Sequence, residues 1–64
     1  RKSLVAARDI KAGEKLTKNM ISFKRPGNGI ETKYLKNILG KVIKKNILYD
    51  KPFRKSHFYH TKFK

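Results

Sequence analysis

The middle of the chain reads Lys-Arg-Pro-Gly-Asn-Gly-Ile at residues 24–30. Proline fixes φ and lacks a backbone N–H, and glycines disfavour regular structure, so this stretch is neither a helix nor a central strand. We expect an ordered turn or an exposed loop. Pro26, Gly27 and Gly29 give that loop a defined shape that an ordinary flexible loop would lack.

Short extended segments precede this loop. Residues 3–10 are predicted to form a strand, and Gly13 follows where a tight turn needs a positive φ. Thr17 is placed to cap one helical turn over residues 18–20, and residues 21–23 return to the two-residue period of a strand. The first part of the chain is therefore predicted to be two strands joined by a turn and a single helical turn.

A helix and a further strand are predicted after the loop. The apolar residues at positions 34, 35, 38 and 39 share one helical face, and Gly40 stands where a residue just past a helix end is expected. Residues 31–39 are therefore predicted to be a short helix. Residues 41–47 read as another strand.

The second half of the chain repeats the first. Residues 6–21 and residues 43–58 share an order of basic, Asx, isoleucine, turn and apolar positions at an offset of 37 residues. Two such units would pack about a pseudo-twofold axis and pool their apolar faces, including Leu16 and Ile47, into one core. The alternative is an accidental match between lysine-rich patterns. The matched pairs include Arg8 and Lys45, Asp9 and Asn46, Ile10 and Ile47, Gly13 and Asp50, and Leu16 and Phe53.

The size and composition of the chain limit its class. Sixty-four residues make one small domain, and without cysteine there is no disulfide framework and no thiolate metal site. A reducing, cytoplasmic compartment is the natural expectation. The apolar runs are far shorter than the roughly 18 residues of a membrane span, so no membrane contact is expected.

The charge of the chain allows two interpretations. A net charge of +14 attracts polyanions, because each lysine or arginine that neutralises a phosphate releases counterions. However, the lysines are dispersed and form no basic arm, so specific nucleic-acid binding is not expected.

Three blocks of residues, in order and at matching spacing, carry a resemblance to a known family. They are SLVAARDIKAGE at residues 3–14, KRPGNGI at residues 24–30 and ILGK at residues 38–41. Together they resemble the C-terminal antifreeze-like domain, also called the SAF domain, of sialic acid synthases, over nearly the whole chain. The resemblance implies a mostly β fold, the β-clip, with short strands, one-turn helices and internal pseudo-twofold symmetry. Residues 1–64 would then be a single SAF domain, and because they begin at Arg1 rather than Met, we expect the C-terminal fragment of a larger synthase.

The resemblance also implies a function. In this family the small domain follows a TIM barrel, which holds a divalent metal, Mn²⁺ or Mg²⁺, and condenses phosphoenolpyruvate with an N-acylmannosamine-type sugar to give a nonulosonic acid. The parent would be a transferase, whereas the small domain is expected to hold no cofactor and to catalyse nothing alone. The domain caps the active site of the partner subunit in a homodimer, where the arginine of the Arg-Pro-Gly motif binds the acylamino group of the sugar.

The motif match assigns this arginine to Arg25. A guanidinium offers a fixed fork of donors and a permanent charge, which suits a carbonyl oxygen beside anionic groups. The implied substrate-binding residues are Arg25, Lys24 and Asn28, and the implied loop-shaping residues are Pro26, Gly27 and Gly29.

Two other functions remain as alternatives. The fold of fish type III antifreeze protein is similar, but charges such as Arg8, Asp9 and Lys18 do not suit a flat ice-binding face. A polyanion-binding module is the second alternative, and a salt titration against DNA would test it, since tight binding that persists at physiological salt would count for it. His57 and His60 lie three residues apart, but no cysteine or nearby carboxylate completes a metal site, so no metal is expected.

Overall fold

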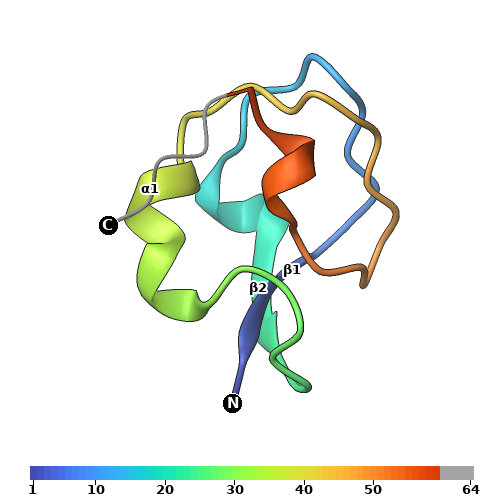
Figure 1. Ribbon diagram of the computed structural model, residues 1–64. Helices are drawn as coiled ribbons and strands as arrows, with labels where there is room; N and C mark the ends of the chain where they lie inside the picture. Colours follow the sequence, from blue (N-terminus) through green and yellow to red (C-terminus); the bar gives the residue numbers. More distant parts are fainter. Residues whose placement is uncertain (60–64) are drawn as a thin grey trace.

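The computed structural model describes residues 1–59 and is built around one small antiparallel sheet (Figure 1). Strand β1 pairs with strand β2 in a register that matches Ser3 with Lys24 and Ala6 with Ile21. Short helical turns and extended segments surround this pair, which confirms the predicted mostly β fold. The elements are β1 (Ser3–Ala6), η1 (Lys18–Met20), β2 (Ile21–Lys24), η2 (Thr32–Tyr34), α1 (Leu35–Ile38) and η3 (Lys55–His57), where η marks a 3₁₀ helix.

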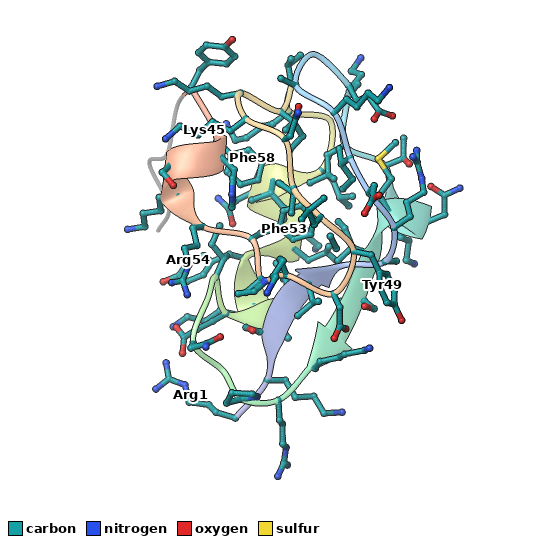
Figure 2. All side chains as sticks on the ribbon, turned by 90° about the vertical axis from the view of Figure 1, so that its right-hand side faces the viewer. Arg1, Lys45, Tyr49, Phe53, Arg54 and Phe58 are labelled. Carbon is teal, nitrogen blue, oxygen red and sulfur yellow. The ribbon has the colours of Figure 1, made fainter. Side chains whose placement is uncertain are left out.

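The core draws on both halves of the chain. Leu16 and Ile47, the two predicted core residues, are 1% and 2% exposed. Phe53 and Phe58 bring their ring centroids to 6.3 Å with the rings tilted by 35°, and Figure 2 shows Phe53 in the middle of the molecule. The buried apolar cluster consists of Leu4, Ala6, Ile10, Leu16, Met20, Ile30, Ile38, Ile43, Ile47, Phe53 and Phe58.

The predicted pseudo-twofold symmetry is confirmed by the backbone hydrogen bonds. Ile10 and Ile47, which the repeat aligns, donate to one another's carbonyl oxygens at 2.8 Å in both directions. Two residues that bond to one another in this reciprocal way lie on either side of the axis, which passes between them. An accidental sequence match would not produce this arrangement.

Two side-chain hydrogen bonds are also related by the pseudo-twofold axis. The Asp9 carboxylate accepts a hydrogen bond from the Tyr49 N–H at 2.7 Å. In the other half, the Asn46 amide oxygen accepts from the Ala12 N–H at the same distance. The Asx position of each repeat therefore holds the turn of the other repeat, which explains why both halves carry a short side chain with an acceptor oxygen there.

Two predicted strands are shorter than expected. The strand predicted at residues 3–10 ends at Ala6, and the strand predicted at residues 41–47 is reduced to isolated bridges. The physical reason is that successive residues bond to different segments rather than to one neighbour. For example, the Ile43 N–H donates to the Glu14 carbonyl, and the Lys44 N–H donates to that of His57. The alternation of side chains indicates an extended backbone, but it does not indicate whether a single neighbouring strand pairs with the whole segment.

The predicted helix at residues 31–39 forms as η2 followed by α1, and Gly40 ends it with φ at +84°. Ile38 is buried, and Tyr34 and Leu35 pack against the core, as the helical face predicts. Thr17 stands at the N-cap of η1, as predicted, but its side chain makes no capping bond to the backbone. Its hydroxyl bonds to the Asn19 side chain instead.

The stability of the fold should fall as the pH is lowered through the range where histidine titrates. The Nδ1 atom of His57 accepts a hydrogen bond from the Arg54 N–H, which requires that atom to be unprotonated. Burial, followed by the charges of Lys45 and Arg54, lowers the pKa of His57 below its usual 6.5. The folded state thus binds fewer protons than the unfolded state as the pH falls through about 6.5, and folding weakens there.

Urea unfolding measured from about pH 7.5 to about pH 5.5 checks this expectation. The matched variant is His57→Met, because Met20 occupies the symmetry-related position, buried and without a titrating group. This variant should lose the part of the pH slope that wild type shows below about pH 6.5. Equal slopes in the two proteins would show that His57 does not cause it.

Candidate functional site

The loop after β2, in which the Arg25–Pro26 peptide bond is cis, is held by contacts at several points. The Ser3 hydroxyl donates to the Pro26 carbonyl at 3.3 Å, and Nη1 of Arg54 donates to the Asn28 carbonyl at 2.9 Å. At the end of the loop the Ile30 N–H donates to the Phe53 carbonyl at 2.9 Å. These contacts make the loop an ordered turn, as the sequence predicts.

Gly29 is required by close packing. A Cβ atom there would lie 2.7 Å from both the carbonyl oxygen of Phe53 and the Cβ of Pro52. Gly27 has less severe crowding, since its Cβ would lie 3.0 Å from the backbone of Arg1. At both positions the absence of a Cβ allows the loop to lie against neighbouring backbone.

Arg25 lies exposed at the exit of β2. Its guanidinium makes no hydrogen bond or ion pair with any of residues 1–59, so its donors face solvent. Beside it is a cavity of about 230 Å³. The apolar lining of this cavity comes from Val5, Pro26 and Pro52, and the polar lining comes from Lys24, Arg25, Asn28, Asp50 and Lys51.

Lys24 differs from Arg25 because its charge is already paired. Its Nζ lies 2.6 Å from Oδ1 of Asp50 and 5.6 Å from the ring centroid of Tyr49. The hydrogen bond to Asp50 and the charge of that carboxylate raise the pKa of Lys24. This side chain therefore stays protonated at neutral pH, and a substrate would have to compete with Asp50 for it.

Asn28 lies between two cavities. Besides the cavity beside Arg25, it lines a second one of about 400 Å³, on the side of the loop that faces Arg54 and Glu31. Its side chain is exposed, while its backbone carbonyl is taken by Arg54. Of the three residues predicted to bind substrate, the structure thus leaves Arg25 and the side chain of Asn28 open to a ligand and gives Lys24 a partner.

Asp50 lines the cavity beside Arg25, which the sequence does not predict. The repeat does place it opposite Gly13. However, its contact with Lys24 joins residues 26 positions apart, and no local pattern reports such a contact.

Neither a metal centre nor a membrane span was found in the described part of the chain. Residues 1–59 contain no group of three or more metal-ligating side chains placed to hold an ion, and His60, one of the two histidines considered above, lies outside them. No helix within the same residues has the length and apolar character needed to cross a bilayer.

Comparison with known proteins decides the family. The SAF domain family matches residues 1–58, nearly the whole chain. The chain belongs to the SAF domain family.

Two curated relatives resemble this SAF domain. An uncharacterized protein of Methanocaldococcus jannaschii is 64% identical over 44 residues, which are 69% of this chain and 13% of that protein. The N,N'-diacetyllegionaminic acid synthase of Campylobacter jejuni is 44% identical over 54 residues, which are 84% of this chain and 16% of that enzyme. The SAF domain thus spans less than a fifth of the length of these relatives.

Proposed function

We propose that this SAF domain caps the active site of a sialic acid-type synthase and places Arg25 over the substrate. The observation that carries the proposal is the Arg25 guanidinium, which is exposed and unpaired among residues 1–59 at the exit of an anchored loop. A structural arginine would be expected to bond to the fold, as Arg54 does. The similarity to the Campylobacter jejuni synthase supports the same function.

Arg25 has the chemistry for this task. Its guanidinium keeps its charge at any relevant pH and presents N–H groups in a rigid fork. We propose that these groups donate to the carbonyl oxygen of the acylamino substituent on an N-acylated amino sugar. The positive charge also lowers the energy of the carboxylate and phosphate of phosphoenolpyruvate nearby. Arg25 therefore binds and orients the sugar, and no bond is made or broken at this residue.

The remaining parts of the reaction are assigned to the parent protein. We propose that the parent is a cytoplasmic homodimer, that its barrel holds the Mn²⁺ or Mg²⁺, and that the cap of one subunit covers the barrel of the other. No residue of this domain is assigned to that metal. Asn28 is proposed to contact the substrate beside Arg25, because its side chain lines the same cavity.

Replacing Arg25 by alanine in the full-length protein should lower kcat/KM for the N-acylated sugar by about 10- to 100-fold. This range corresponds to the loss of a charge-assisted hydrogen bond, about 1.5 to 3 kcal/mol. Arg25→Lys, which keeps the charge but loses the fork, should lie between wild type and Arg25→Ala. The matched control is Arg8→Ala, an exposed arginine of the first repeat that lines neither described cavity. Wild-type activity in Arg25→Ala would remove Arg25 from the site.

Complementation tests whether the cap acts on the partner subunit. One chain carries Arg25→Ala with an intact barrel, and the other carries an intact cap with an inactivated barrel. If the cap crosses between subunits, the mixed dimer has one site with both an intact barrel and an intact Arg25, so activity returns. If the cap serves its own barrel, no such site exists, and the mixture stays as inactive as Arg25→Ala alone.

A further inference from the structure

The two repeats differ at one position that carries strain. Gly13 and Asp50 are related by the pseudo-twofold axis, and both adopt a positive φ, +96° and +70°. Their N–H groups make equivalent hydrogen bonds. The Gly13 N–H donates to the carbonyl oxygen of Ile43, and the Asp50 N–H donates to the carbonyl oxygen of Ala6, both at 2.8 Å. Glycine meets this conformation without steric cost, whereas a residue with a Cβ does not. The turn itself therefore does not require aspartate at position 50.

The carboxylate of Asp50 has a partner beside the functional loop. Oδ1 of Asp50 lies 2.6 Å from Nζ of Lys24, the last residue of β2 and the neighbour of Arg25. The ammonium also lies over the Tyr49 ring, so both residues of the turn contact it. Asp50, Lys24 and Arg25 line the same cavity.

The loop is thereby held from two sides. Arg54 binds its far end through the Asn28 carbonyl, and the turn at residues 49–50 binds its start through Lys24. Figure 2 shows Arg54 and Tyr49 on opposite sides of the molecule. The Arg25 guanidinium makes no hydrogen bond, ion pair or ring contact within residues 1–59 that would fix its direction. Its direction must therefore come from the neighbouring residues.

We infer that Asp50 is a positioning residue, which acts through Lys24 to fix the direction in which β2 presents Arg25. The inference rests on the proposed function of Arg25 as the substrate-binding residue. On this inference Lys24 holds the start of the loop and does not contact the substrate directly. The left-handed backbone strain at Asp50 is retained because its carboxylate positions Lys24 beside Arg25, a role that the fold itself does not require.

Asp50→Gly in the full-length protein separates these roles, because glycine is favoured at a positive φ. The variant should unfold at a temperature no lower than wild type, while kcat/KM for the sugar falls by about two- to fivefold, the range expected for an exposed ion pair. The loss should come mainly from KM for the sugar, whose acylamino group is the proposed hydrogen-bond partner of Arg25. Lys24→Gln should give the same loss, and the double variant should be no worse than either single one.

The decisive comparison is made in the Arg25→Ala background. If Asp50 acts only through Arg25, then Asp50→Gly changes nothing further there. An equal loss with and without Arg25 would overturn the inference, as would wild-type kinetics of Asp50→Gly. The proposed function fails separately, if Arg25→Ala alone retains full activity. Arg8→Gln, which removes an exposed ion pair with Glu14 in the other repeat, is the control that should leave activity unchanged.

Discussion

Replacing Ile47 by alanine should lower the free energy of unfolding by about 2 to 4 kcal/mol, and Leu16→Ala should do the same. Ile47 is 2% exposed and bonds to Ile10 across the pseudo-twofold axis, so the truncation leaves a cavity where the two repeats meet. A domain of this length has about 3 to 10 kcal/mol of stability in total. The loss is therefore a large share of it, and the variant should unfold at a clearly lower urea concentration than wild type.

Urea unfolding followed by circular dichroism measures this effect, since the chain has no tryptophan. Ile47→Val should cost only about 0.5 to 1.5 kcal/mol, because it removes one methylene. Leu48→Ala is the matched control, because the neighbouring Leu48 is 63% exposed, and it should cost less than about 0.5 kcal/mol. If Ile47→Ala and Leu48→Ala prove equally mild, the proposed core is wrong.

The repeat could be predicted from sequence because a symmetric fold requires similar residue types at both related positions. Ile10 and Ile47 flank the axis, and Asp9 and Asn46 each hold the other half's turn, so the residue type required at one position recurs at the other. The lengths of the strands could not be predicted in this way. Whether the residues around Ile43 pair with one strand or bond to several segments depends on which distant parts of the chain lie beside them. The residue types in one segment do not indicate this.

The candidate site was predictable in part for a similar reason. The loop residues and Arg25 follow one another in the chain, so their pattern can be read locally. The contacts that hold the loop come from elsewhere, through Ser3, Asp50 and Arg54. The sequence therefore indicates the loop and its candidate residue Arg25, while only the structure shows which distant residues hold the loop.

Replacing Gly29 by alanine should cost about 3 kcal/mol of stability, the upper end of the range for overpacking. The new Cβ would lie 2.7 Å from the Phe53 carbonyl oxygen and from the Cβ of Pro52. Neither atom belongs to a flexible side chain, and the same carbonyl accepts the bond from Ile30 that closes the loop. Relief of the clash must therefore move the loop or the segment at residues 52–53, and Phe53 is fully buried.

A comparison with Gly13→Ala isolates this steric effect. Gly13 has a φ of +96°, but a Cβ at this position would meet no atom within 4 Å, so alanine there costs only left-handed strain, about 1 to 2 kcal/mol. Gly29→Ala should be the more destabilising of the two in urea unfolding. In the full-length protein it should also lower kcat/KM for the sugar in the molecules that remain folded, because the loop that carries Arg25 has shifted. A Gly29→Ala variant as stable as wild type would mean that the loop does not pack against residues 52–53 as described.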